Sequence, residues 1–257
     1  MKRLLPAILA CLSLAAPLAS GRDIRITSAS SLSGQVVIAE WFYEKEMEGK
    51  SAVSVPREFR TWPDQINVQT SDDFSLRIEA HPGDRLVLSP GQYVADLFVF
   101  TPNLTITTEE NSTTRASIWG TVEIDADGAV LDGIAVTGAR KGLSSGHGIE
   151  VNRVFVHSIT IRNCRVADKD WTGIHLIGPN GEIDWLRVEN CELVHNGLDG
   201  MDAQSTAHLV VTGCTITDNG WNFDHGVGVR IGSNVTSVEM TDNVIARNRF
   251  ADVSRKD

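Results

Sequence analysis

The chain has 257 residues, of which 42% are hydrophobic, so it is long and apolar enough to bury a core in one or two domains. Its formal charge of −10 at pH 7 argues against nucleic acid and anionic membranes as partners. The same charge repels an anionic polysaccharide unless cations or a local basic patch intervene.

The segment 1–20 resembles a secretory signal peptide. Lys2 and Arg3 are followed by an apolar run from Leu4 to Leu18 and by small residues around Ser20. This run is short for a membrane span, and prolines interrupt it. We therefore expect a protein that is secreted or periplasmic and has no membrane span.

Residues 21–71 do not repeat and are predicted to cap one end of the repeats that follow. Between Val36 and Met47 the apolar residues recur at the i, i+4 spacing of a helix, and a second short helix is predicted for Ser71–Ala80. Since a stack of repeats needs its open end covered, we expect a short N-terminal helical cap.

Residues 72–257 are predicted to form one repetitive domain. A first motif occurs in five copies and a second, interleaved motif in four. Copies of the first begin at Leu131, Ile161, Val188, Val211 and Met240, and copies of the second at Gly148, Gly173, Gly200 and Gly228. Self-similarity at such a period indicates stacked structural units.

Both motifs alternate apolar and polar residues with a period of two, which is the pattern of a strand with one buried face. No helical segment fits between them, and this excludes a layout of alternating strands and helices. A coil of two or three short strands, laid on the next coil about 4.8 Å away, pairs the backbone and buries a continuous core. The sequence therefore predicts an all-β fold, a right-handed parallel β-helix.

Two stretches resemble the pectate-lyase-like superfamily. They are the turn Pro82-Gly83-Asp84 ahead of an apolar strand and the turn-and-strand unit 196–202, within a resemblance that extends over roughly residues 75–253. The resemblance implies a right-handed parallel β-helix. It leaves the activity open, because the superfamily includes pectate, alginate and chondroitin lyases, uronate epimerases, polygalacturonases and non-catalytic members.

Two positions of the repeat carry the same residue type in three coils, and both are predicted to be structural. One holds cysteines, whose odd number and stacked positions favour buried free thiols over disulfides. The other holds asparagines, expected to form an internal ladder that bonds the backbone of the turns. These residues are Cys164, Cys191 and Cys214, and Asn196, Asn219 and Asn248.

The alternation also predicts which side chains of the second motif face solvent. With Ile149 and its equivalents pointing inward, the residue after each of them points outward from the same sheet, about 4.8 Å from the next coil. This column consists of Glu150, His175, Asp202 and Arg230. The other residues predicted to contribute to the site are His147, Asn152, Trp171, Asp199, Gln204, Trp221 and His225.

These residue types suit the removal of the proton at C5 of a uronate, which leads to β-elimination or epimerisation of a polysaccharide. The reaction needs a base, a group that neutralises the carboxylate, and a proton donor. We assign these roles to His175, to Arg230, and to His147 or His225 respectively. Substrate contacts are assigned to Glu150, Asn152, Trp171, Asp199, Gln204 and Trp221.

Three alternatives remain open from the sequence. No cofactor is certain, but calcium held by Asp199, Asp202 and Glu150 could replace Arg230 as the neutralising charge. An inverting glycoside hydrolase could use Glu150 and Asp202, which would lie about 9 to 10 Å apart. A non-catalytic carbohydrate-binding, adhesin-like or structural β-helix would need the column only for contacts.

Overall fold

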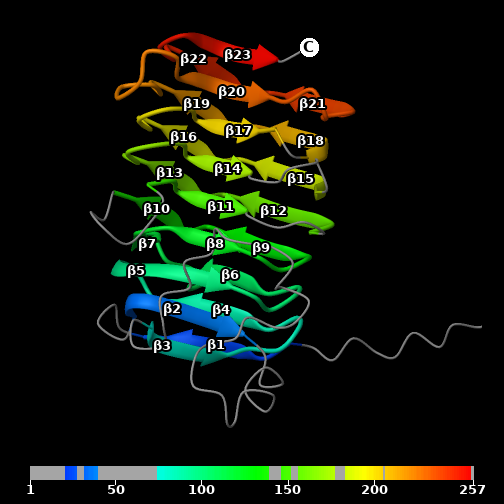
Figure 1. Cartoon of the computed structure of the whole chain (residues 1–257). Helices are drawn as coiled ribbons and strands as arrows, with labels where there is room; N and C mark the ends of the chain where they lie inside the picture. The colour runs from blue at the N-terminus through cyan, green and yellow to red at the C-terminus, as the bar shows by residue number, and fades with distance from the viewer. Residues whose placement is uncertain are drawn as a thin grey trace, which may run out of the picture.

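The coils of the chain stack from a blue N-terminal end to a red C-terminal end (Figure 1). This computed structural model describes residues 21–27, 32–39, 74–138, 146–151, 156–176, 183–204 and 206–255. Strands of successive coils pair in parallel, so equivalent residues of neighbouring coils lie side by side. The predicted parallel β-helix is confirmed.

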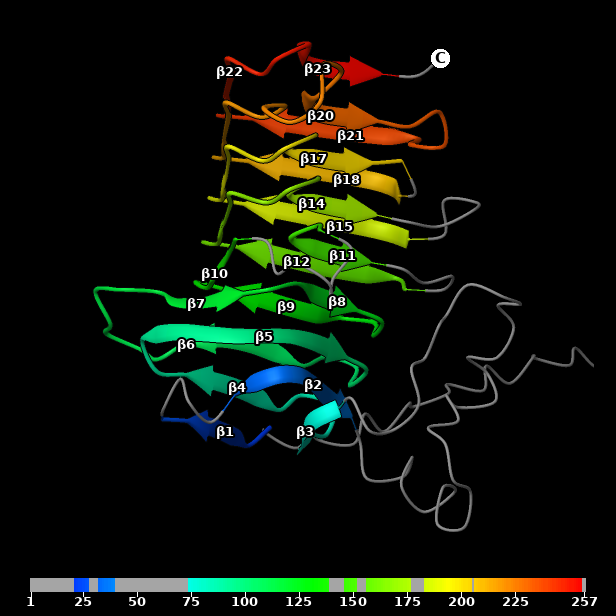
Figure 2. The same ribbon diagram turned by 60° about the vertical axis from the view of Figure 1, so that its left-hand side comes forward.

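Each full coil contributes one strand to each of three faces, which we name A, B and C (Figure 2). Face A contains β1 (Asp23–Ile26), β4 (Arg85–Leu88), β6 (Thr105–Thr108), β9 (Ala129–Asp132), β12 (Ser158–Arg162), β15 (Ile183–Glu189), β18 (Thr206–Thr212) and β21 (Ser237–Thr241). Face B contains β3 (Phe74–Glu79), β2 (Ser33–Ala39), β5 (Gly91–Val99), β8 (Val122–Ile124), β11 (Ile149–Val151), β14 (Ile174–Leu176), β17 (Met201–Ala203), β20 (Val227–Ile231) and β23 (Ala251–Arg255). Face C contains the first part of β5 together with β7 (Ala116–Trp119), β10 (Ala135–Thr137), β13 (Arg165–Ala167), β16 (Glu192–Val194), β19 (Thr215–Thr217) and β22 (Val244–Ala246).

The core is a set of columns of apolar side chains that point into the coil. On face B one column consists of Ile149, Ile174, Met201 and Val229, which are all fully buried. Full burial of an aliphatic side chain contributes about 2 kcal/mol. The repeated alternation therefore stabilises every coil against the next one, and it fixes which residues of face B point outward.

The corner from face A to face C is the same in five successive coils. Two residues separate the strands, and the first of the two has a positive φ each time. These residues are Gly133 (69°), Asn163 (55°), Asn190 (52°), Gly213 (66°) and Asp242 (55°). Glycine, asparagine and aspartate are the residue types that tolerate this left-handed conformation best. By contrast, the corner from face C to face B varies in length, because the segment 168–173 between β13 and β14 is shorter than the segment 138–148 between β10 and β11.

The predicted cysteine column is confirmed, since Cys164, Cys191 and Cys214 are buried free thiols. The backbone N–H of Cys164 donates to Sγ of Cys191 at 3.4 Å, and that of Cys191 donates to Sγ of Cys214 at 3.4 Å. In the last coil Asn243 takes this position, and its Oδ1 accepts the N–H of Cys214 at 2.8 Å. The column therefore satisfies the backbone donors of the invariant corner.

The predicted asparagine ladder is also confirmed. Oδ1 of Asn219 accepts hydrogen bonds from the backbone N–H and from Nδ2 of Asn196, both at 3.0 Å. Oδ1 of Asn248 accepts the same two bonds from Asn219, at 3.1 and 2.8 Å. Each side chain thus bonds the turn of the coil before it and keeps buried polar groups paired.

The predicted helical cap is wrong over the residues that the structure describes. Val36 and Ile38 are buried on β2, which pairs with β5, while Ile78 is buried and Glu79 exposed on β3. This period of two belongs to strands, and pairing in face B outweighs the helical spacing of the local sequence. The described residues contain no helix that could cross a bilayer. The predicted signal peptide and most of the capping segment lie outside them.

Candidate functional site

The outward column of face B exists as the alternation predicts. Glu150 on β11 pairs with His175 on β14, and His175 pairs with Asp202 on β17. Arg230 on β20 is next in register after Asp202. Although these side chains project from the sheet, Glu150 and Asp202 are buried, and His175 and Arg230 are half-buried. The column is therefore a partly enclosed row of ionisable groups.

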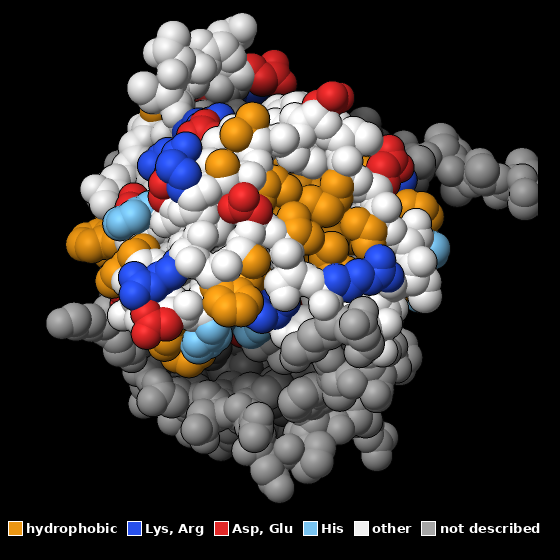
Figure 3. Space-filling view, turned by 90° about the horizontal axis from the view of Figure 1, so that it is seen from above, with side chains coloured by type: hydrophobic (Ala, Val, Ile, Leu, Met, Phe, Trp, Pro, Cys, Tyr) orange, Lys and Arg blue, Asp and Glu red, His pale blue; other side chains and the backbone are white. Residues whose placement is uncertain are grey.

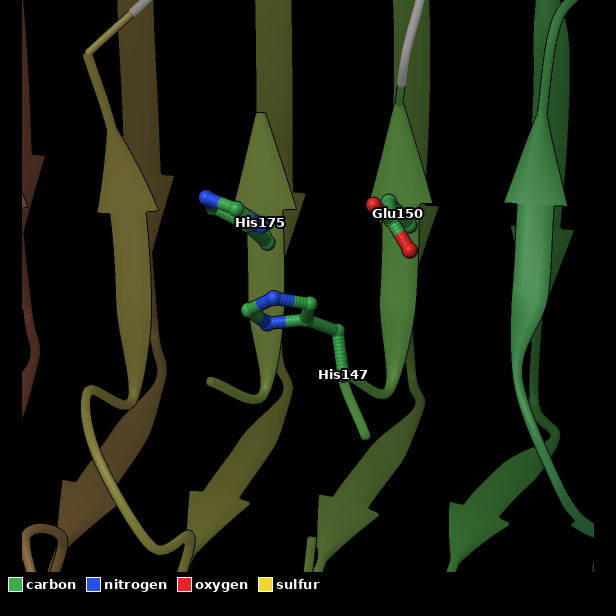
Figure 4. Close-up of side chains that lie close together, drawn as sticks. All are labelled: His147, Glu150 and His175. Carbon is green, nitrogen blue, oxygen red and sulfur yellow. The ribbon is translucent and has the colours of Figure 1, made fainter. Parts of the chain in front are cut away.

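His147 joins the column from the corner before β11. Its ring lies against that of His175, with centroids 3.9 Å apart and an angle of 30° between the rings (Figure 4). His147, Glu150 and His175 each offer one ligand atom, and these atoms all lie within 4.8 Å of one another. We refer to these three residues as the His–Glu–His cluster.

Gly148 lets the coils approach closely beside this cluster. A Cβ atom there would lie 2.5 Å from the carbonyl oxygen of Gly173 and 2.4 Å from Cγ1 of Val166. Because only glycine fits, the backbone after His147 can pass directly over the next coil. This close passage brings His147 to a side chain of that coil, His175.

Burial lowers the pKa of both histidines. The pKa of His147 falls to about 3, because its ring is desolvated and because charge on His175 would repel it. The pKa of His175 falls to about 4, mainly through desolvation, although the carboxylate of Asp199 opposes this shift. Both imidazoles are therefore neutral at pH 7, and each has one nitrogen with a lone pair.

The two rings differ in their hydrogen bonds. The backbone N–H of Thr172 donates to Nδ1 of His147 at 3.3 Å, which is long for such a bond. Nδ1 of His175 is buried and has no hydrogen-bond partner among the residues that the structure describes. Since buried polar atoms in proteins are nearly always paired, His175 offers a position for an atom of a ligand.

Arg230 is bound to a buried carboxylate, and the sequence did not reveal this pairing. Its Nε and Nη2 donate to Oδ2 and Oδ1 of Asp199, both at 2.8 Å, and Nη2 also donates to the carbonyl of His225 at 3.1 Å. These hydrogen bonds to Asp199 raise the pKa of Arg230. Asp202 lies 4.0 Å from Nε of Arg230 and accepts a hydrogen bond from Gln204 at 2.7 Å. The positive charge of Arg230 is therefore largely balanced within the protein.

The three acidic residues assigned to calcium do not come together. Both oxygens of Asp199 are occupied by Arg230, and Oδ1 also accepts the backbone N–H of Val227 at 2.8 Å. Across the described ranges, the group of three or more potential metal ligands is the His–Glu–His cluster, which shares only Glu150 with the predicted calcium set.

A row of aromatic rings leads away from the cluster. Trp171 is 45% exposed, and its ring meets that of His147 edge-on at 5.5 Å. The ring centroid of Phe223 lies 5.6 Å from that of Trp171, and the ring centroid of His225 lies 6.0 Å from that of Phe223. Trp221 is separate from this row. Its ring stacks on that of His195, and its Nε1 donates a hydrogen bond to the backbone carbonyl of His195. Asn152 lies outside the described residues.

Lys169 is a buried residue near the site that the sequence analysis missed. It occupies the ladder position of the preceding coil, since its backbone N–H donates to Oδ1 of Asn196. Its Nζ donates to the carbonyls of Gly120 and Gly138. Burial lowers the pKa of Lys169 to about 8, although Asp96 and Asp170 oppose the shift. The repeat could have identified this position, because Lys169 follows Val166 at the same interval as Asn196 follows Leu193.

Comparison with known proteins identifies the architecture. The family model described as right handed beta helix region matches residues 103–254, which is more than half of the chain. The match supplies the right-handed sense of the winding and includes the whole His–Glu–His cluster. No curated protein and no solved structure matches the chain significantly.

Proposed function

Because this chain belongs to the right-handed β-helix family, we propose that it is an exported protein that binds a polysaccharide along face B and acts on its uronate residues, by β-elimination or C5 epimerisation. The observation that carries the proposal is the column of Glu150, His175, Asp202 and Arg230, which lie on four neighbouring strands of face B from successive coils. Such a column spans about 14 Å and is long enough to meet several sugar residues of one polymer.

The aromatic row supports a sugar ligand. Flat rings such as the half-exposed indole of Trp171 pack against the apolar faces of sugar rings, while neighbouring polar groups bind hydroxyls. Trp171 touches His147, so a sugar resting on this indole would reach the His–Glu–His cluster. We therefore place the reacting sugar at the cluster and the rest of the polymer along the column.

The chemistry depends on His175 in this proposal. His175 is central in the column, between Glu150 and Asp202, and it contacts the ring of His147. Loss of the C5 proton requires that the negative charge of the uronate carboxylate be offset. Arg230 was assigned this role from the sequence, but its hydrogen bonds to Asp199 leave little net positive charge. We therefore keep Arg230 as a residue that positions Asp199, and the offset requires a positive charge other than this ion pair.

The proposal predicts that His175→Ala abolishes activity while leaving the thermal stability of the chelator-treated protein unchanged. The wild-type protein would be assayed on alginate, pectate and chondroitin, by ultraviolet absorbance of unsaturated products and by NMR for epimerised residues. His157→Ala is the matched control, because His157 is exposed before β12 on face A and pairs with Asp184. Activity is expected in the wild type and the control and not in His175→Ala. Equal turnover in all three proteins would contradict the proposal.

A non-catalytic carbohydrate-binding protein is the second candidate, and the Arg230–Asp199 ion pair favours it. A surface used only for contacts can pair its charges internally, as these two residues do. This candidate predicts that the wild type binds a polysaccharide without forming any product. An inverting hydrolase using Glu150 and Asp202 would instead release reducing ends without ultraviolet absorbance.

A further inference from the structure

The His–Glu–His cluster combines two imidazoles and a carboxylate in a buried setting. His147 and Glu150 are only 5% and 4% exposed, and His175 is half-buried. The three residues come from two neighbouring coils, His147 and Glu150 from one and His175 from the next. We infer that these three side chains form a binding site for a divalent transition-metal ion, which was not among the ligands predicted from the sequence.

The spacing of the ligand atoms suits such an ion. Nitrogen and oxygen ligands about 2.1 Å from a zinc ion stand about 3 to 4 Å from one another. The candidate atoms of the cluster all lie within 4.8 Å of one another. Side-chain rotations that move these atoms by about 1 Å would therefore bring all three into bonding distance of one ion. The two strands need not move, because their register already places Glu150 beside His175.

The imidazoles can present nitrogen atoms to the ion. Nδ1 of His175 is buried and has no hydrogen-bond partner in the described part of the chain. Nδ1 of His147 accepts a long bond from Thr172, so coordination through this atom would exchange a weak contact for a strong one. The cluster therefore has the donor atoms of a metal site, and coordination would satisfy the buried nitrogen of His175.

The ligand types select the class of metal. Calcium prefers six to eight oxygen ligands, and two imidazoles are unsuited to it. Two histidines and one carboxylate are typical of zinc, iron, manganese and cobalt sites, and three protein ligands leave a coordination position open. His175 is half-buried, so the cluster meets solvent at this residue.

Metal binding can be measured without any sugar, so this inference does not rest on the proposed function. If both hold, His175 acts as a ligand, the ion offsets the uronate carboxylate, and Asp202 is the next group in register that could take the proton. Metal binding without polysaccharide activity would reject the proposed function alone. Activity that is unaffected by chelation would reject the link between the two.

The test is a titration of the purified, chelator-treated full chain with Co²⁺ and Zn²⁺. Visible absorbance should show one Co²⁺ bound per chain, calorimetry should give the same stoichiometry for Zn²⁺, and Zn²⁺ should raise the melting temperature. Glu150→Gln and His175→Ala should each raise the dissociation constant of the metal by about 10- to 100-fold. His157→Ala, on face A, should bind as the wild type does.

Glu150→Gln keeps the size of the side chain, so it separates loss of a ligand from loss of the fold. Circular dichroism would confirm that each variant is folded before titration. The inference is overturned if the wild type binds neither ion, or if Glu150→Gln and His175→Ala bind as tightly as the wild type. It is equally overturned if His157→Ala is the variant that loses the ion, because binding would then be on face A.

Discussion

At the scale of single residues, Lys169 shows how one position of the repeat can hold a different kind of side chain. The asparagines of the ladder bond the neighbouring turn through a short amide, whereas Lys169 reaches across the coil to the carbonyls of Gly120 and Gly138. It is fully buried, and a charged ammonium group is costly in such a place. This cost appears as the lowered pKa of Lys169.

The lowered pKa predicts a dependence of stability on alkaline pH. Between pH 8 and 10.5 the unfolded chain keeps a proton on Lys169 that the folded chain has released, so the free energy of unfolding rises with pH. Relative to Lys169→Met, the wild type should gain about 2 to 3 kcal/mol across this range. Urea denaturation of both proteins from pH 7.5 to 10.5 measures the gain. A difference that stays constant with pH would contradict it.

The sequence predicted which residues of the column face outward but could not predict how they pair. Alternation fixes the direction of Glu150 and His175, because every second residue of a strand lies on the same face. It says nothing of corner residues such as His147 and Asp199, whose directions depend on the backbone of the turn. The ring contact of His147 and the ion pair of Asp199 with Arg230 therefore had to come from the structure.

At the scale of the strand, the glycine that opens each second motif has a packing role. A Cβ atom on Gly200 would lie 2.6 Å from the carbonyl oxygen of Gly228 and 2.6 Å from Cγ2 of Ile216. Gly148 and Gly173 meet the carbonyl of the next coil in the same way. The motif begins with glycine because the backbones of successive coils touch at this corner.

Gly200→Ala should therefore lower the free energy of unfolding by about 2 to 3 kcal/mol. The matched control is Gly133→Asn, where a Cβ atom meets nothing within 4 Å and the φ of 69° is close to the one that Asn163 adopts. This control should change stability by less than about 0.5 kcal/mol. Urea denaturation compares the two variants, and equal stability would argue against the packing role.

The N-terminal strands show where local spacing misleads. Val36, Val37 and Ile38 fit a helix when read with the apolar residues after them, and fit a strand when read alone. Short apolar runs are ambiguous in this way, and β-branched residues favour the strand. Pairing of β2 with both β3 and β5 decides the outcome, and these partners are distant in the sequence. By contrast, the five-fold repetition of the first motif left no such ambiguity for the chain after Ala129.

At the scale of the whole molecule, the coils depend on their neighbours for stability, and the C-terminal coil leaves large apolar side chains exposed. Apolar side chains gather on this end of the stack (Figure 3). In the final coil Phe250 is 68% exposed and Val244 is 57% exposed, whereas Leu209 and Val211 on β18 are buried. Stability in stacked repeats is a sum of contacts between adjacent units, so a coil with fewer contacts opens more often.

Hydrogen exchange should therefore show a gradient along the stack. Amides of β21, β22 and β23 should exchange at least about tenfold faster than those of β12, β15 and β18, which corresponds to about 1.4 kcal/mol less in opening free energy. Exchange followed by mass spectrometry of peptides from each strand measures this. Uniform protection from β12 to β23 would show that the end coil is held as firmly as the middle ones.

The bends between the three faces differ in how much their length varies, and this affects where loops of a new length can be accommodated. The bend from face A to face C keeps one length and one left-handed φ in every coil from β9 onward. The bend into face B already varies in length, and the connection out of face B is longer from β14 to β15 than from β17 to β18. From β9 onward, differences in length are thus confined to the two borders of the strands that carry the His–Glu–His cluster, while the bend from face A to face C keeps one geometry. Loops there can be exchanged to suit a different ligand without disturbing the register that holds the molecule together.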